Sequence, residues 1–354
     1  MKTIAVLGGG GTGCTIAADN ILRGNTVRLW EDEQQWNKNL AGVQEEGGIH
    51  ITGNAITGFA KDIKLCKNMV EALEGAQIIL IAALASRHEA IFKELAPLLR
   101  PGQTVCVSAG CGSVILLRNL LGDKQNIITG EMSGNVYPCR MDGKAKVIVA
   151  LPYKVKNAAA FPAKDTDKFI CELKDVYECK AVKNILESAL NAPNLSIHLA
   201  ASLLNVCAID KNPDFRLYAE GLSENVLSII DAVELEKLKL LTVLGYECVL
   251  HAPFMRQLVQ YDSFPEFNIF RSLLGPSGMK HRYITEDAAF GQILFYSLAE
   301  HFNIVAPCTR ALIHLAGVIN NTDYFSLGQT IKKLGMGDMS VSQINEYLST
   351  GVAG

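Results

Sequence analysis

The sequence predicts an α/β domain with a mostly parallel sheet, followed by a second domain built only of helices. Two observations predict this division. Short β-rich runs alternate with helical patterns over residues 1–150, and long helical periods replace them after about residue 185. We therefore expect one domain at residues 1–185 and another at 186–354, each of an ordinary domain length.

Each expected strand is a short, continuously apolar run, as in strands that are buried on both faces of a sheet. The expected strands are Thr3–Leu7, Thr26–Trp30, Ile78–Ala82, Thr104–Ser108, Asn126–Thr129 and Lys146–Ala150. The segment Ala158–Asp165, which contains Pro162, is expected to be a linker. The expected helices of the second half are Leu195–Ala208, Leu217–Leu244, Ala288–Phe302 and Thr309–Ile319.

The composition excludes several classes of protein. Hydrophobic residues make up 49% of the chain and charged residues 19%, which is enough material for packed cores. The net charge is −3 without a block of like charge, so we expect no nucleic-acid partner and no membrane partner. The apolar stretch Ile78–Ala85 is far shorter than the roughly 18 residues of a membrane helix. Met1–Leu7 is too short an apolar run for a signal peptide, and we expect a cytoplasmic protein.

The cysteines and histidines do not predict a metal site. None of the ten cysteines forms a C-x-x-C pair, so we expect reduced thiols that are mostly buried. Several histidines lie outside the motifs discussed below and form no pair at metal-ligand spacing: His50, His251, His281, His301 and His314.

A glycine-rich motif follows the first expected strand. The run Gly8-Gly9-Gly10-Gly11-Thr12-Gly13 contains G-x-G-x-x-G between a strand and a helix, which is the setting of a dinucleotide-binding Rossmann domain. In such a loop Gly8 permits the tight turn, Gly10 lets the backbone approach the pyrophosphate, and Gly13 lets helix and strand pack closely. Gly11 and Thr12 open the helix whose N-terminus faces the phosphates.

An acidic residue at the end of the second strand predicts the cofactor. Glu31 stands where a carboxylate accepts hydrogen bonds from the adenosine ribose hydroxyls and repels a 2′-phosphate. Arg28 lies three residues earlier in the strand, where it is less well placed for a 2′-phosphate. The sequence therefore favours NAD(H) over NADP(H).

The helical half carries two further motifs. The run Asn191-Ala192-Pro193-Asn194-Leu195-Ser196-Ile197-His198 opens it, and Arg282-Tyr283-Ile284-Thr285-Glu286-Asp287 precedes an apolar helix. Both resemble the octopine/nopaline (opine) dehydrogenase family, which has a histidine after an N-P-N-like turn and an R-Y-x-x-E-D segment. Further similar segments lie along the chain: Gly47-Gly48-Ile49 with Gly53 and Gly58, Ala158–Ala163, and Gly328–Met336. The loop Ser108–Gly112 stands where the family has L-P-G-x-x-G.

The resemblance implies roles for particular residues and a helical domain like the C-terminal domain of 6-phosphogluconate dehydrogenase. His198 matches the family's acid/base histidine, Asp287 the aspartate that pairs with it, and Arg282 the arginine that holds a substrate carboxylate. Elementary chemistry agrees with the pair, because an ionised carboxylate beside an imidazole fixes its tautomer and stabilises the imidazolium. We expect Asp287 in the first turn of a helix from Glu286 that Thr285 caps, where the helix terminus favours the ionised carboxylate.

The resemblance therefore implies an NAD-dependent dehydrogenase acting on CH–NH groups, which condenses an α-keto acid with an amino acid reductively. Ser133, after the fifth expected strand, is a weaker substrate-binding candidate, and His88 is expected to be structural. Two alternatives stay open. One is a ketopantoate- or glycerol-phosphate-type NAD(P) reductase, although we find no lysine in a matching motif. The other is a non-catalytic NAD(H)-sensing protein. The apolar helices would permit a homodimer without requiring one.

Overall fold

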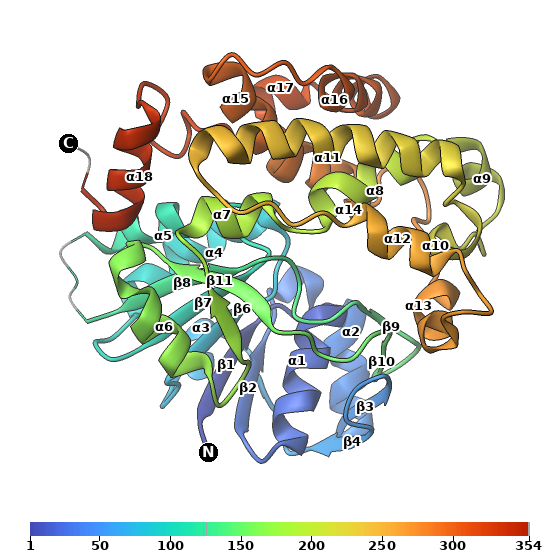
Figure 1. The fold of residues 1–354 in the computed structure, drawn as a ribbon. Coiled ribbons are helices and arrows are strands. Elements are labelled where there is room, and N and C mark those ends of the chain that lie inside the picture. Colours follow the sequence, from blue (N-terminus) through green and yellow to red (C-terminus); the bar gives the residue numbers. More distant parts are fainter. Residues whose placement is uncertain (123, 125, 353–354) are drawn as a thin grey trace. The chain divides into compact units, whose positions relative to one another are not determined.

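The protein was analysed as a computed structural model, which describes residues 1–122, 124 and 126–352. The chain forms two compact units. Unit 1 comprises Met1–Ser188 and Glu346–Gly354, and unit 2 comprises Ala189–Asn345. Figure 1 labels helices and strands of both units along the chain.

Unit 1 is built on an eight-stranded sheet with the order β12-β11-β8-β7-β6-β1-β2-β5. Its strands are β1 (Thr3–Leu7), β2 (Thr26–Trp30), β5 (Lys64–Cys66), β6 (Ile78–Ile81), β7 (Thr104–Ser108), β8 (Ile128–Met132), β11 (Lys156–Ala160) and β12 (Cys179–Ala181). The six strands from β8 to β5 run parallel to one another. Strands β6 and β7 are buried along their whole length, as the continuously apolar runs predict. The predicted parallel sheet of the N-terminal domain is confirmed.

A second sheet in unit 1 was not predicted. It has four strands in the order β4-β3-β10-β9: β3 (Gly48–Gly53), β4 (Gly58–Lys61), β9 (Cys139–Met141) and β10 (Lys146–Val149). The expectation that Lys146–Ala150 belongs with the parallel strands of the main sheet is therefore wrong. Only Val147 and Val149 of β10 are buried, and this alternation is typical of a strand with one buried face.

The expected linker at Ala158–Asp165 is also wrong in its first half. Strand β11 ends at Ala160 and pairs with β8 in antiparallel register, which places three buried alanines in the main sheet. Pro162 follows this strand, where a missing backbone N–H disrupts no ladder. Alanine has no strong strand preference, so the pairing is set by the neighbouring strand and not by local propensity.

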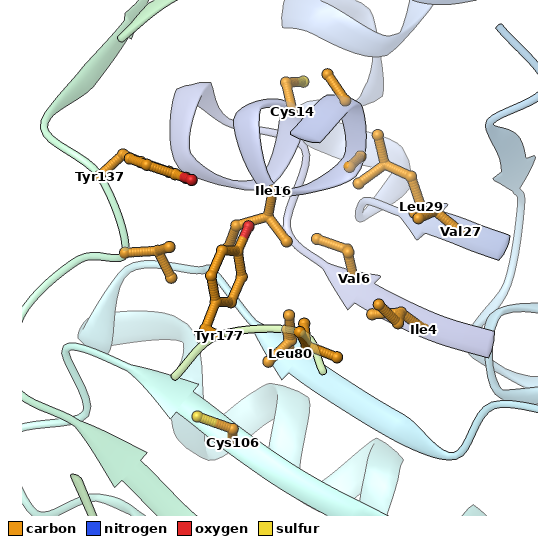
Figure 2. Packing of buried hydrophobic residues seen from close by; sticks show 14 of the residues in the cluster. Ile4, Val6, Cys14, Ile16, Val27, Leu29, Leu80, Cys106, Tyr137 and Tyr177 are labelled. Atoms are coloured by element: carbon orange, nitrogen blue, oxygen red, sulfur yellow. The ribbon is translucent and has the colours of Figure 1, made fainter. Parts of the chain in front are cut away.

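The helices of unit 1 surround these strands: α1 (Gly11–Leu22), α2 (Glu33–Glu46), α3 (Met69–Leu73), α4 (Ala85–Leu98), α5 (Val114–Leu121) and α6 (Thr166–Leu173). Helix α1 contributes Cys14 and Ile16 to an apolar core that includes Val6 of β1 (Figure 2). A buried polar group also anchors it. The Asp19 carboxylate accepts hydrogen bonds from Tyr177 at 2.9 Å and Arg23 at 3.1 Å.

The regular elements among the described residues of unit 2 are all helices. Its helices are α8 (Asn194–Leu203), α9 (Val206–Lys211), α10 (Leu217–Glu220), α11 (Glu224–Leu244), α12 (Ala252–Leu258), α13 (Asn268–Ser272), α14 (Arg282–Glu286), α15 (Ile293–His301), α16 (Pro307–Asn320) and α17 (Tyr324–Leu327). Helices α7 (Ile185–Leu190) and α18 (Val341–Thr350) contain residues of both units. The expected helix Leu217–Leu244 is interrupted before Ser223, which caps α11 by accepting from the Val226 N–H. None of the helices in the described residues is long and apolar enough to cross a membrane.

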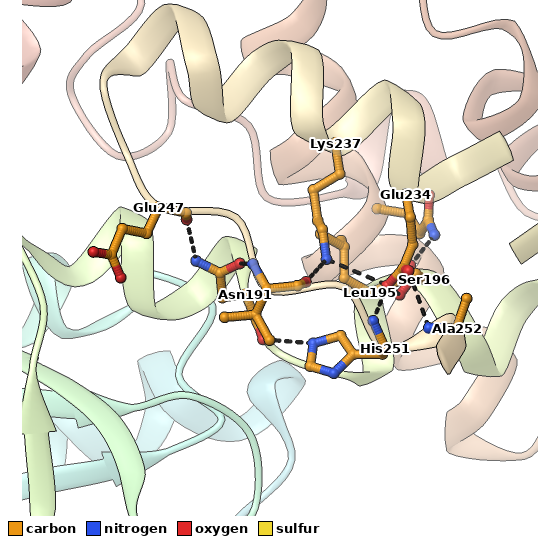
Figure 3. Close-up of polar contacts among 10 residues, drawn as sticks. Asn191, Leu195, Ser196, Glu234, Lys237, Glu247, His251 and Ala252 are labelled. Carbon is orange, nitrogen blue, oxygen red and sulfur yellow. Dashed lines mark hydrogen bonds and ion pairs between the residues drawn. The ribbon is translucent and has the colours of Figure 1, made fainter. Parts of the chain in front are cut away.

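Buried charges on α11 position the start of α8 (Figure 3). The Glu234 carboxylate accepts hydrogen bonds from the Ser196 hydroxyl at 3.0 Å and from the His251 N–H at 2.7 Å. Lys237 lies 3.5 Å from Glu234 and donates to the Val249 carbonyl at 2.6 Å. Since a buried charge without such partners is costly, these contacts restrict how α8, α11 and α12 can pack.

We expect Gly13→Ala to destabilise unit 1 strongly. A Cβ at Gly13 would lie 1.7 Å from the Gly8 carbonyl oxygen, and backbone cannot easily move aside. The free energy of unfolding should fall by about 2–4 kcal/mol, as for other overpacked sites. Denaturant unfolding followed by circular dichroism measures the change.

Gly10→Ala is the matched control, because a Cβ at Gly10 would meet no described atom within 4 Å. Its unfolding free energy should stay within about 1 kcal/mol of the parent value. Equal losses in the two variants would contradict the close packing of α1 on the sheet.

Candidate functional site

The glycine-rich loop joins β1 to α1, and its central residue Gly10 borders open space. Gly8 has a φ of +123°, and a Cβ there would lie 2.6 Å from the Ala82 carbonyl oxygen. Gly10 borders open space, and no side chain among the described residues caps α1. The N–H groups of Gly11 and Thr12 therefore lie in an uncapped first helical turn, which suits a phosphate group. The residues present fit a dinucleotide pyrophosphate.

Glu31 follows β2 and its carboxylate is almost fully buried. Oε2 accepts the Gly9 N–H at 2.7 Å, and Oε1 accepts the Asp32 N–H at 2.8 Å. Oε1 also lies 2.7 Å from the Arg87 guanidinium of α4. The sequence prediction missed Arg87, because no spacing rule connects the residues after β6 to the end of β2.

A strained loop follows β7. Ala109, Cys111 and Gly112 all have positive φ values, of +57°, +52° and +80°. The buried Glu131 carboxylate accepts a hydrogen bond from the Gly112 N–H at 2.9 Å, and this bond fixes the loop to β8. A Cβ at Gly110 would lie 2.2 Å from a Glu131 oxygen, which explains the glycine. Burial raises the pKa of Glu131 to about 8.

Two other polar residues near these strand ends have structural partners. Burial lowers the pKa of His88 to about 4, and its ring bonds Ser113 at 2.8 Å and the Ala83 carbonyl at 3.2 Å. This is consistent with the structural role expected for His88. Ser133 is buried in unit 1, where its backbone N–H donates to the Asn157 carbonyl at 2.8 Å.

In unit 2, the structure brings His198 of α8 to Asp287. The distance from Nδ1 to Oδ2 is 2.6 Å, and both side chains are buried. The two residues are 89 positions apart in the chain, so only the packing of α8 against the following helices makes this contact. The amide of Gln292 donates to the Leu195 carbonyl and joins the same two segments.

The helix around Asp287 differs from the prediction. Helix α14 begins at Arg282 with His281 as its cap, and residues Asp287–Gln292 form a π-helical segment. Asp287 is therefore not in a first helical turn, and Thr285 is not the cap. Burial raises the pKa of Asp287 to about 8, against the opposing charge of Arg282. The 2.6 Å contact joins Oδ2 of Asp287 to Nδ1 of His198 by a hydrogen bond.

Two tyrosines complete the surroundings of His198. The Tyr218 hydroxyl lies 2.9 Å from Nε2, and the Tyr283 ring stacks on the imidazole with centroids 3.5 Å apart. The Tyr218 hydroxyl also donates to that of Tyr283 at 3.3 Å. The sequence prediction missed Tyr218, since nothing in the short helix α10 marks it. Arg282 is half-buried, and its guanidinium carbon lies 5.1 Å from the Tyr283 ring centre.

Two family models match the chain. The helical domain of NAD/NADP octopine/nopaline dehydrogenases matches residues 181–320, and the N-terminal part of NAD-dependent glycerol-3-phosphate dehydrogenase matches residues 3–114. An opine dehydrogenase from Arthrobacter sp. (strain 1C) is 25% identical over 97% of this chain and 98% of its own length.

Solved structures share the fold. Octopine dehydrogenase in complex with NADH and agmatine superimposes with a TM-score of 0.72 at 17% identity, over 99% of this chain and 98% of its own. A ketopantoate reductase from Ralstonia eutropha JMP134 has a TM-score of 0.62 at 14% identity, over 90% of this chain and 98% of its own. The predicted fold class, a Rossmann-like domain followed by a helical domain, is confirmed.

The raised pKa of Glu131 predicts a pH-dependent stability. Between about pH 4.5 and 8 the unfolded chain has this carboxyl ionised while the folded protein keeps it protonated, so the free energy of unfolding falls as the pH rises through this window. We expect Glu131→Gln to remove on the order of a few kcal/mol of this dependence, because the amide stays neutral and its oxygen still accepts the Gly112 N–H. Denaturant midpoints at pH 5, 6, 7 and 8 measure it.

Glu89→Gln serves as the control, because Glu89 is an exposed carboxylate on α4. That variant should keep the slope of the parent protein. An unchanged slope in Glu131→Gln would mean that Glu131 is ionised in the folded state.

Proposed function

From its relationship to the opine dehydrogenase family, we propose that this protein is an NAD-dependent opine-type dehydrogenase. It would couple the amino group of an amino acid to an α-keto acid, reduce the resulting imine, and run the reverse oxidation. The observation that carries the proposal is the buried His198–Asp287 contact at 2.6 Å, formed by the two segments that resemble the family. The similarity to opine dehydrogenases supports an NAD-dependent oxidoreductase, for which we propose action on CH–NH bonds.

The first unit would hold the cofactor. The N–H groups of Gly11 and Thr12 would bind the pyrophosphate, Gly10 would allow its approach, and Glu31 would face the adenosine ribose. When bound, NADH supplies a hydride for the imine carbon. The space beside the Gly10 Cα is open, so no described side chain would block the pyrophosphate there.

The second unit would supply the acid and base. Asp287 holds Nδ1 of His198, so Nε2 is the nitrogen that would exchange a proton with the substrate. The Tyr218 hydroxyl, 2.9 Å from Nε2, would keep the ring oriented until substrate binds. Arg282 would bind a substrate carboxylate through paired N–H groups. Ser133 is proposed as a further substrate contact on the weaker ground of its position after β8.

The buried position of Lys237 bears on the alternative of a ketopantoate- or glycerol-phosphate-type reductase. Such a reductase would need an accessible lysine in the helical unit. Lys237 is buried on α11 in contact with Glu234 and the Val249 carbonyl, and burial lowers its pKa. A lysine held in this way has a structural role. A non-catalytic NAD(H) sensor would have no need of the His198–Asp287 contact.

The direct test is a matrix of amino acids against α-keto acids, read by NADH absorbance with mass detection of the secondary amine product. NADH oxidation that requires both substrates, with the amine formed in equal amount, is the expected result. Oxidation with a keto acid alone would favour the reductase alternative. Cofactor binding without turnover on any pair would favour the sensor.

We expect His198→Ala to lower turnover by about 10²–10⁴-fold, the usual contribution of general acid–base catalysis. NADH affinity should change less than about twofold, because the proposed pyrophosphate site lies in unit 1. Asp287→Asn should also lower turnover, and the acid limb of the oxidation pH profile should move to lower pH because the imidazolium loses its carboxylate. Steady-state kinetics over pH 5–9 and NADH titration measure these effects.

His314→Ala is a matched control, because His314 is exposed on α16. It should leave turnover unchanged. The losses in a His198→Ala/Asp287→Asn double variant should be less than additive, since Asp287 acts through His198. Near-normal turnover of His198→Ala would end the assignment.

A further inference from the structure

The Glu31–Arg87 ion pair occupies the place where the ribose of the cofactor would bind. Arg87 reaches from the first turn of α4 to the carboxylate at the end of β2, with 2.7 Å between Nη2 and Oε1. The Arg87 side chain is 27% exposed and that of Glu31 is 7% exposed. The Arg87 side chain is thus more accessible to solvent than the carboxylate with which it pairs.

Most of the hydrogen-bond acceptor positions of the Glu31 carboxylate are already occupied by protein donors. A carboxylate offers about four lone-pair positions. Three are taken by the N–H groups of Gly9 and Asp32 and by Arg87. One position remains, whereas a ribose presents two hydroxyl groups. Arg87 therefore competes with one ribose hydroxyl for Glu31.

Local electrostatics do not favour Arg87 in its own helix, because a cation in the first turn of a helix faces the positive end of the helix dipole. The described residues include no acidic side chain in that first turn. The ion pair with Glu31 offsets this unfavourable position. The guanidinium, on a partly exposed side chain, has further N–H donors that could bind a phosphate oxygen.

We propose that Arg87 is a determinant of cofactor specificity, which neutralises Glu31 and lets the adenosine-ribose site admit a 2′-phosphate. This inference rests on the proposed dinucleotide site and deepens it. The protein still binds NADH. It binds NADPH far more tightly than it would if the Glu31 carboxylate were not paired with Arg87. Glu31 and Arg87 act as opposing elements, one favouring the diol and the other the phosphate.

The experiment compares NADH and NADPH affinities of the full-length protein by the fluorescence of the bound reduced nicotinamide. The measured quantity is the ratio of the NADPH Kd to the NADH Kd. Arg87→Met keeps the apolar stem and removes the charge, and it should raise this ratio by about tenfold or more, which corresponds to about 1.4 kcal/mol. Glu31→Gln frees Arg87 for a phosphate and should lower the ratio by a similar factor.

Two further measurements separate a specificity role from a purely structural one. Lys93→Met removes a cation of the same helix that pairs with exposed Glu89, and it should leave the ratio unchanged. Raising the salt concentration should weaken NADPH binding to Glu31→Gln more than NADH binding, because the extra contact is ionic.

The outcomes distinguish this inference from the proposed function. If Arg87→Met lowers thermal stability and binds both cofactors with an unchanged ratio, Arg87 only ties α4 to β2, and the inference fails while the dinucleotide site stands. If the parent protein binds neither NADH nor NADPH, both fail. A ratio that rises in Arg87→Met and falls in Glu31→Gln, with Lys93→Met unchanged, supports the inference.

Discussion

The close contact between α1 and the end of β1 is the constraint on which unit 1 depends. Gly13 lies so near the Gly8 carbonyl that no other residue fits. This contact brings the first turn of α1 to the carboxyl end of the parallel strands and leaves its N–H groups without a side-chain cap. The same approach lets Glu31 reach the Gly9 N–H. The phosphate and ribose sites that we propose would thus depend on one packing contact, since backbone donors can point at a ligand only where no side chain intervenes.

In unit 2, the arrangement of the helices depends on buried polar groups that require hydrogen-bond or ionic partners. Glu234 and Lys237 tie α11 to the start of α8 and to the segment before α12 (Figure 3). The buried side chains of His198 and Asp287 likewise serve as hydrogen-bond partners for each other. Because an unpaired buried charge costs several kcal/mol, each of these contacts excludes alternative packings of the helices. The π-helical segment that begins at Asp287 fits this account, since such segments are common where a side chain must be directed at a partner.

Local patterns were sufficient for part of the structure. Strands β1, β2 and β7 begin and end at the predicted residues, because each has a mostly apolar run that suits a strand packed on both faces of a sheet. Patterns failed for β11 and β10. Alanines in β11 carry no strong signal, and β10 alternates in a way that also suits an edge of the main sheet. For Asp287, the expected helix start was misplaced because His281, and not Thr285, caps the helix.

What the sequence by itself determined was the order of the two domains, the glycine loop with Glu31, and the segments that contain His198, Arg282 and Asp287. The domain order and the glycine loop follow from periodicity and short-range sterics, which act between neighbouring residues. The segments with His198, Arg282 and Asp287 were identified by their resemblance to the opine dehydrogenase family. Tertiary structure alone decided that Arg87 reaches Glu31, that Tyr218 faces Nε2 of His198, and that Asp287 lies buried against Nδ1 of His198. Those facts depend on desolvation and on contacts between residues far apart in the chain, and both are set only when the helices and strands pack together.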